Sequence, residues 1–143
     1  MPQPRLRRAA TIARREWRLA LETALLTVAM RSALGLVSLV RCFDVVGELV
    51  RRLPRGRPID PARAAQVVEL VSGHLGRQAC LTQTLVLYAV LARRAVDAEV
   101  VIGTSADGGR FAAHAWLRTA DRQWLSRGSD AFVPLCAIGG VRR

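Results

Sequence analysis

The stretch Gln78-Ala79-Cys80-Leu81-Thr82-Gln83-Thr84-Leu85-Val86-Leu87-Tyr88 decides the fold, because it places a cysteine where an apolar helix begins. The helix predicted over residues 80–94 is apolar nearly all round, so we expect it to be central and buried. A second stretch, Phe111-Ala112-Ala113-His114-Ala115-Trp116-Leu117, is a predicted strand with a histidine in its middle. A helix-start cysteine and a strand histidine are the minimal constellation of a thiol hydrolase or acyltransferase.

Cys80 is placed for nucleophilic catalysis. The unpaired N–H groups and the dipole at a helix N-terminus favour a thiolate, which is the reactive form of cysteine. The same N–H groups, with that of Cys80 as one natural donor, can stabilise the oxyanion of a tetrahedral intermediate. The side chain of Gln78 is a further candidate donor. The alternative interpretation of Cys80 is an inert buried cysteine.

His114 is the candidate general base. Strand alternation puts Ala112, His114 and Trp116 on one face of the predicted strand. The small alanines around His114 leave room for the end of a helix. Its imidazole could take the proton of Cys80 and later protonate the leaving amine. The alternative is a histidine that is hydrogen-bonded in the core.

A third group should orient the imidazole, as in other cysteine–histidine hydrolases. A three-residue turn after this strand pairs Thr119 with Gln123 and puts Ser126 and Asp130 on the face of His114. Asp130 is therefore the predicted third member, with Ser126 as the alternative polar residue. Asp130 could equally be an ordinary loop carboxylate.

The cysteines and histidines do not have the spacing of a compact zinc site, so we expect neither a metal nor another cofactor. The odd number of cysteines, without a C-x-x-C pair or a secretory signal, favours a reducing cytosol over a disulfide framework. We therefore expect a cytoplasmic protein, and a capping role at a helix end for His74. The cysteines and histidines whose spacing does not match a zinc site are Cys42, Cys80, Cys136, His74 and His114.

The chain has 143 residues, enough for one domain with a buried core. Its 22 basic residues, all arginine, outnumber 11 acidic ones, and the net charge is +11. A basic surface attracts nucleic acid, anionic membrane or acidic polypeptide. Aromatic residues make up only 5% and do not alternate with the basic ones, which disfavours nucleic acid. An acidic peptide, a membrane surface and a merely solvated arginine-rich surface stay open.

The N-terminal third is predicted to be helical. Residues 16–40 form one largely buried helix, which Gly35 could break, and residues 43–53 form a shorter one. The uncharged run at residues 32–40 is far shorter than the roughly 18 residues of a transmembrane helix, so none is expected. A basic helix that is apolar elsewhere can also rest on a membrane surface.

Residues 54–59, with two prolines and a glycine at 54–58, are a predicted linker. They separate an N-terminal helical region, residues 1–53, from a core at residues 60–143, within one compact domain overall. Asp60 and Pro61 are the expected N-cap and first residue of the next helix, which ends near residues 72–76.

Strands dominate the C-terminal part of the chain. We predict strands at residues 96–103, 111–119, 123–127 and 131–135, with a turn at residues 104–110. Because the helices come first and an antiparallel sheet second, the predicted fold class is α+β, with the cysteine-bearing helix packed on the sheet.

At this point the pattern resembles a known family, the transglutaminase-like leader peptidases of lasso-peptide biosynthesis. These are the stand-alone B proteins of split systems, and their core is of the papain-like cysteine peptidase type. The resemblance runs over roughly residues 19–135. It is carried by Cys80-Leu81-x-x-Thr84-Leu85-x-Leu87, Leu91-Ala92-Arg93-Arg94, Ala98-x-Val100-Val101-Ile102-Gly103 and Ala113-His114-Ala115-Trp116-Leu117.

The resemblance implies a cysteine peptidase that removes the leader from a ribosomally made precursor. Its partners would be the leader peptide, a small recognition protein that holds the leader, and an ATP-dependent cyclase that closes the macrolactam on the freed amine. Cys80 would be the nucleophile and His114 the base. Family members often carry Asp about where Ser126 stands, so either Asp130 substitutes or a dyad operates.

Two other functions stay open from the sequence alone. The absence of Asp at Ser126 favours a non-catalytic scaffold of transglutaminase-like type that only holds a peptide or partner. The high net charge favours a basic protein that binds a membrane or nucleic-acid surface. Cys80 reactivity would separate the first of these from a peptidase, and salt dependence of binding would identify the second.

Overall fold

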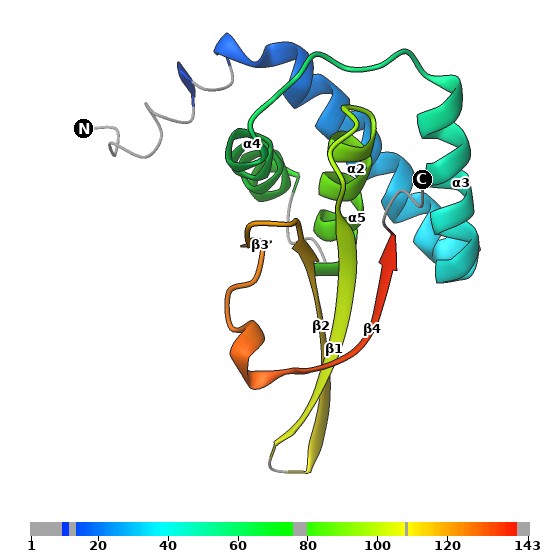
Figure 1. The fold of residues 1–143 in the computed structure, drawn as a ribbon, viewed down its shortest axis with the longest axis vertical. Coiled ribbons are helices and arrows are strands. Elements are labelled where there is room, and N and C mark those ends of the chain that lie inside the picture. The colour runs from blue at the N-terminus through cyan, green and yellow to red at the C-terminus, as the bar shows by residue number, and fades with distance from the viewer. Residues whose placement is uncertain (1–9, 12–13, 76–79, 108, 140–143) are drawn as a thin grey trace.

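The computed structural model describes residues 10–11, 14–75, 80–107 and 109–139 of the chain. Over these residues the main helices come first and the strands follow (Figure 1). The helices are α2 (Trp17–Leu36), α3 (Leu39–Arg52), α4 (Pro61–His74) and α5 (Cys80–Ala92). The later elements are β1 (Glu99–Asp107), β2 (Arg110–Arg118), β3 (Gln123–Trp124), a short 3₁₀ helix η1 (Ser129–Ala131) and β4 (Val133–Gly139). The predicted α+β class is confirmed.

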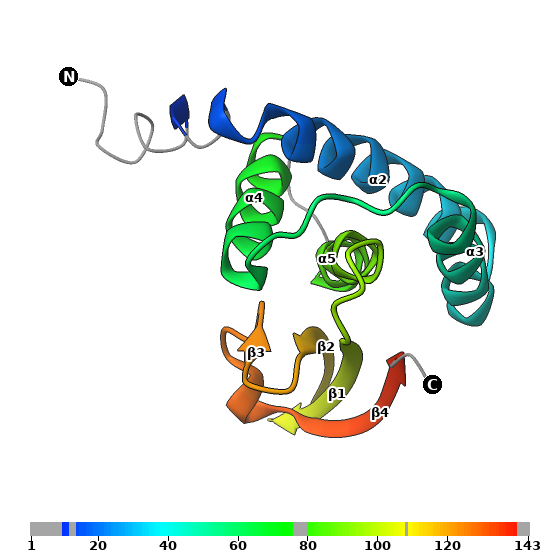
Figure 2. The ribbon, with the colours of Figure 1, turned by 45° about the horizontal axis from the view of Figure 1, so that its top comes forward.

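Helix α5 lies at the centre of the fold, between the other helices and the sheet (Figure 2). It is buried on nearly all sides, as its uniformly apolar sequence predicts. Because both layers pack against it, the start of α5 is held in a fixed place relative to β2. Its fully buried side chains are Thr84, Leu85, Val86, Leu87, Ala89, Val90 and Leu91.

The four strands form one antiparallel sheet in the order β3-β2-β1-β4. The hairpin of β1 and β2 is longer than predicted, because pairing continues to Asp107 and Arg110. The prediction of a turn over residues 104–110 is therefore wrong. Gly109 adopts a positive φ of 76°, which lets the chain reverse in a tight loop.

The break between the first two helices also differs from the prediction. Gly35 lies inside α2, whereas Val37 and Ser38 are extended and separate α2 from α3. Helix α3 therefore starts at Leu39, four residues earlier than predicted. The helix α4 is as expected: the Asp60 carboxylate accepts a hydrogen bond from the Ala62 N–H at 3.2 Å.

Helix α2 is long and apolar enough to cross a membrane by length and composition, which the sequence analysis had not expected. The core helix of a soluble protein and a signal sequence near the N-terminus meet the same criteria. One side of α2 packs on the fold through Leu19, Leu26 and Met30, which are buried. The opposite side carries exposed apolar residues.

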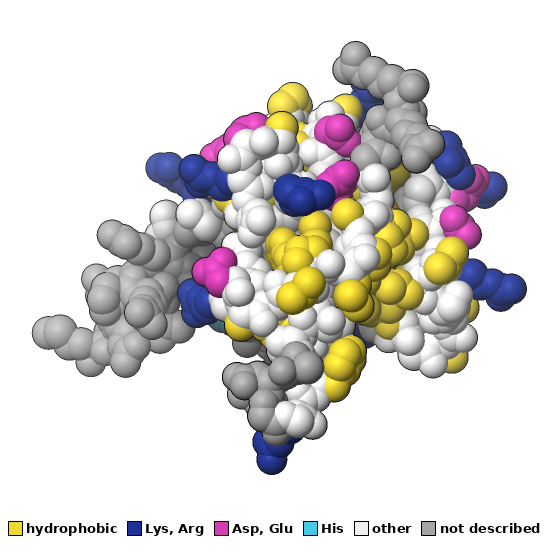
Figure 3. All heavy atoms as spheres, turned by 60° about the horizontal axis from the view of Figure 1, so that its bottom comes forward, with side chains coloured by type: hydrophobic (Ala, Val, Ile, Leu, Met, Phe, Trp, Pro, Cys, Tyr) yellow, Lys and Arg dark blue, Asp and Glu magenta, His cyan; other side chains and the backbone are white. Residues whose placement is uncertain are grey.

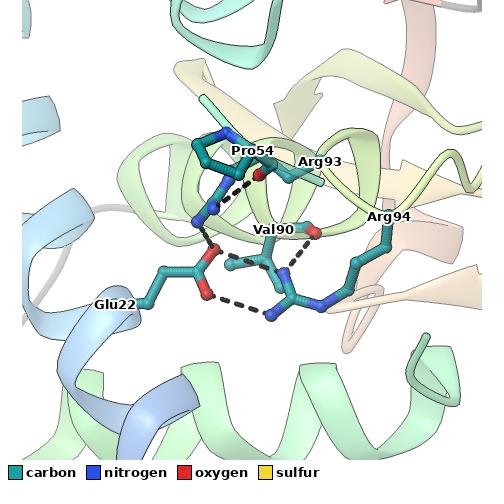
Figure 4. Close-up of polar contacts among 5 residues, drawn as sticks. All are labelled: Glu22, Pro54, Val90, Arg93 and Arg94. Carbon is teal, nitrogen blue, oxygen red and sulfur yellow. Dashed lines mark hydrogen bonds and ion pairs between the residues drawn. The ribbon is translucent and has the colours of Figure 1, made fainter. Parts of the chain in front are cut away.

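A buried ion cluster ties α2 to the end of α5 (Figure 4). One Glu22 oxygen accepts hydrogen bonds from Arg93 at 2.5 Å and Arg94 at 3.2 Å, and the other accepts one from Arg94 at 3.0 Å. The two guanidinium groups also donate to the carbonyls of Pro54 and Val90. The cluster thus joins α2, the segment after α3, and α5 by charge-assisted bonds.

Tyr88, the single tyrosine of the chain, gives a direct test of packing around α5. Its ring meets that of Phe43 edge-on at 5.8 Å. Burial, together with the negative charge of Asp97, raises the pKa of Tyr88. The neutral phenol therefore contributes to the free energy of unfolding. This contribution is fully present at pH values below the pKa of tyrosine in the unfolded chain, about 10, and is lost as the pH rises through the higher pKa of the folded chain.

We expect an ultraviolet titration of the native chain to give a tyrosine pKa above about 10. The same titration in denaturant should return the ordinary value, and Asp97→Asn should lower the native pKa by part of the difference. Coincident native and denatured titration curves would contradict the packing described for Tyr88.

The sheet side of the molecule is rich in exposed apolar side chains. In Figure 3 hydrophobic side chains form a patch on this face, and both acidic and basic side chains surround it. Large side chains of the sheet that are more than half exposed are Phe111, Val133 and Leu135.

Candidate active site

Cys80 and His114 line one cavity of about 210 Å³. Cys80 is the first residue of α5, and His114 lies in the middle of β2. Both side chains are partly exposed, so a ligand in the cavity can reach them. The structure therefore brings together the two residues that the sequence analysis singled out. The other lining residues are Glu69, Gln83, Leu125 and Arg127.

Thr84 connects the two elements that carry these groups. Its side chain is fully buried, and its hydroxyl lies 2.8 Å from the carbonyl oxygen of Cys80 and 3.1 Å from that of Ala115. One hydroxyl proton is shared between the two carbonyls in this geometry. The bond therefore fixes the first turn of α5 against the strand residue that follows His114.

The imidazole of His114 contacts two aromatic rings. Trp116 stacks on it at 5.8 Å between ring centres, and Phe132 lies at 5.3 Å. The predicted alternation is correct here, since His114 and Trp116 share a face. Gly103 pairs with His114 across the sheet, and a Cβ atom there would lie 2.7 Å from the Trp116 ring. The missing side chain of Gly103 makes room for this stack.

The Nε2 atom of His114 is buried and has no hydrogen-bond partner among the described residues. A buried imidazole nitrogen without a partner costs free energy, and such groups occur where a site needs them unpaired. An imidazole nitrogen that no other group occupies is free to exchange a proton with a thiol that reaches it.

The predicted strand register, from which the third member of the catalytic site was assigned, is wrong. Arg118, not Thr119, pairs with Gln123, because the turn has four residues and closes with a 2.9 Å bond from the Thr119 N–H to the Arg122 carbonyl. Pairing ends at Trp124, since Leu125 has a positive φ of 56°. The strand that was to place Ser126 and Asp130 opposite the histidine is therefore absent.

Asp130 lies exposed on η1, and no hydrogen bond joins it or Ser126 to His114 in the part of the chain described. Neither residue lines the cavity. A catalytic role for Asp130 thus stays a prediction that the geometry does not support. Gln78, the predicted oxyanion donor, lies outside the described residues.

Three polar residues of the cavity were missed by the sequence analysis. Gln83 lies one helical turn after Cys80, so its proximity could have been inferred from helix spacing. Glu69 comes from α4 and Arg127 from the segment after β3, and only the tertiary packing brings them here. They give the rim of the cavity one negative and one positive charge for contacts with a bound peptide.

No three His, Cys, Asp or Glu side chains are grouped as a metal site within the described ranges. Cys42 is buried and Cys136 exposed, and both are free thiols, as is Cys80. A larger cavity of about 590 Å³ lies at the start of α2, with arginines around it and no nucleophile. We therefore assign the chemistry to the smaller cavity with Cys80.

Comparison with protein families identifies the family of the chain. The sequence model of one family, described as the Transglutaminase-like superfamily, matches residues 24–137. The chain belongs to this superfamily. No curated protein matches the chain, and no solved structure does. The transglutaminase-like superfamily includes cysteine peptidases and transglutaminases, and both the helix with Cys80 and the strand with His114 lie inside the matched region.

Thr84 gives a prediction for this transglutaminase-like site. Thr84→Val keeps the shape of the side chain but removes the hydroxyl that joins the two elements. We expect the rate of Cys80 alkylation by iodoacetamide to fall toward that of a free thiol. Turnover of a substrate should fall about 10- to 100-fold, because small displacements of reacting groups are costly.

Thr84→Ser is the matched control, because it retains the hydroxyl. It should keep most of the wild-type alkylation rate and turnover. A Thr84→Val chain that stays folded and reacts like wild type would show that the bond does not position Cys80.

Proposed function

We propose that this chain is a cysteine peptidase that removes the leader from a ribosomally synthesised lasso-peptide precursor. The observation that carries the proposal is the shared cavity of Cys80 and His114 within a transglutaminase-like domain. The resemblance of the motifs around these two residues to lasso leader peptidases supplies the substrate class.

The reaction follows from the two side chains. The Cys80 sulfur attacks the scissile carbonyl carbon, and the thiol proton passes to His114. As the C–N bond breaks, the histidine returns that proton to the leaving amine, which becomes the N-terminus of the core peptide. Water then hydrolyses the thioester and releases the leader with a free carboxylate.

The Cys80 N–H and the Gln78 side chain are the proposed donors to the oxyanion. A Cys–His dyad, without a carboxylate, suffices in this proposal, because Trp116 and Phe132 hold the imidazole in place. Asp130, with Ser126 as the alternative, is retained as the sequence-predicted candidate for a third member.

The proposed setting is cytoplasmic. A recognition protein would present the leader, and an ATP-dependent cyclase would use the freed amine to close the macrolactam. The test is to incubate the full chain with a precursor and its recognition protein and to follow the peptide by mass spectrometry. We expect two fragments, the leader and the core, and an intact precursor with every component folded would overturn the proposal.

One observation favours a second function. Because no carboxylate bonds to His114 among the described residues, the chain could be a scaffold that binds a peptide without cutting it. The alkylation rate of Cys80 separates the two. A peptidase requires a thiol that reacts faster than a free cysteine at neutral pH, and a scaffold does not.

A further inference from the structure

The outer side of α2 is an apolar stripe that no described part of the chain covers. Trp17, Leu21, Leu25 and Val28 recur every three or four residues, so they share one side of the helix. Each is more than half exposed, and Leu36 extends the stripe to the end of the helix. Figure 2 shows α2 as the outermost helix, with the other helices and the sheet on its inner side. Exposed apolar patches of this kind mark interaction surfaces.

The inner side of α2 is fixed to the fold. Besides its buried apolar residues, Glu22 is bonded to both Arg93 and Arg94 (Figure 4). To cross a bilayer the helix would have to give up this buried ion cluster. The inner side of α2 therefore stays packed on the rest of the fold, and its outer side is available to a binding partner.

The exposed charges on α2 and on the two residues 14 and 15 before it are of one sign. Between residues 14 and 36, every exposed charged side chain is an arginine: Arg14, Arg15, Arg18 and Arg31. The two acids of this segment, Glu16 and Glu22, are partly buried. Arg15, Arg18 and Arg57 also line the 590 Å³ cavity where the stripe begins. The sheet-side patch differs, because acidic and basic side chains surround it together (Figure 3).

We infer that α2 binds the surface of an anionic phospholipid bilayer. The stripe from Trp17 to Val28 enters the boundary between headgroups and acyl chains, and the arginines contact the lipid phosphates. A helix of 20 residues, about 30 Å long, with an apolar side, a terminal tryptophan and flanking cations has the chemistry of an interfacial helix. This inference does not depend on the proposed peptidase activity.

Vesicle sedimentation of the full chain tests it. Wild type should sediment with vesicles of phosphatidylcholine and phosphatidylglycerol at low salt, and much less with pure phosphatidylcholine or at high salt. The pair Leu21→Ser and Leu25→Ser should weaken binding at least about tenfold. The pair Arg15→Gln and Arg18→Gln should weaken it roughly tenfold.

Matched controls change the same residue types elsewhere. Val133→Ser with Leu135→Ser alters exposed apolar residues of β4, and Arg110→Gln with Arg122→Gln removes the same charge from the start of β2 and from the turn before β3. The apolar control should bind like wild type, and the charge control should lose clearly less than the α2 pair. Thermal unfolding of every variant verifies the fold.

Three results would overturn the inference. One is wild type that stays in the supernatant with anionic vesicles at low salt. Another is equal binding to neutral vesicles, which would leave the arginines without a role. The third is a loss of vesicle binding in the Val133→Ser, Leu135→Ser control that is as large as the loss in the α2 variants. A change of oligomeric state in the Leu21 and Leu25 variant, without vesicle binding by wild type, would instead assign the stripe to a second copy of the chain.

Discussion

Cys80→Ala should abolish leader removal while the protein stays folded. The side chain is small, lies at the start of α5 and is only partly buried, so its loss leaves little empty space. Removing a catalytic nucleophile takes away the covalent step, and we expect turnover to fall by at least about a thousandfold. The measurement is the rate at which precursor is converted to leader and core, followed by mass spectrometry under single-turnover conditions.

Cys136→Ala is the matched control, because Cys136 is an exposed free thiol on β4 outside the cavity. It should leave turnover unchanged and should retain the fast-alkylating thiol. Precursor cutting that persists in Cys80→Ala would rule out the proposed peptidase mechanism. His114→Gln should have an effect of similar order, since without the imidazole neither the thiol nor the leaving amine has a proton partner.

Glu22→Gln should cause the largest loss of stability among single polar substitutions. The side chains of Glu22, Arg93 and Arg94 are 18%, 16% and 7% exposed, so two guanidinium groups would lose their common counter-ion in a largely dry place. Breaking such a pair from one side costs more than the pair itself contributes. With partial exposure taken into account, we expect a loss of about 2–3 kcal/mol.

For a chain of this size that loss lowers Tm by roughly 6–10 °C, measured by circular dichroism or calorimetry. Glu48→Gln is the control on α3. Hydrogen bonds from Arg51 and Arg52 lower the pKa of Glu48, but all three groups are exposed, so Tm should hardly change. Equal effects of the two substitutions would show that burial of the Glu22 cluster does not matter for stability.

Much of the fold was predictable because the decisive signals are local. The apolar sequence of α5 predicts its central place, and Asp60-Pro61 predicts the start of α4, since a cap and a proline act within one turn. The alternation around His114 likewise placed the imidazole and Trp116 on one face. The missed helix break was partly visible, because Ser38 is a residue type favoured at an N-cap.

The errors arose where one residue or one backbone angle decides the outcome. A single extra residue in the turn shifted the pairing of Gln123 from Thr119 to Arg118. A non-glycine residue with positive φ, Leu125, then ended β3 after two residues. Neither is evident from composition or periodicity, so the third member of the site was assigned from a register that does not form.

The contacts of His114 with Trp116 and Phe132 affect how many polar groups the reaction needs. In many hydrolases a carboxylate orients the histidine by electrostatic attraction. Protonation of the carboxylate at low pH weakens this attraction. The indole ring of Trp116 and the phenyl ring of Phe132 restrain the imidazole through packing instead, and neither ring carries a charge. The orientation of this imidazole should therefore not depend on the charge of a third side chain.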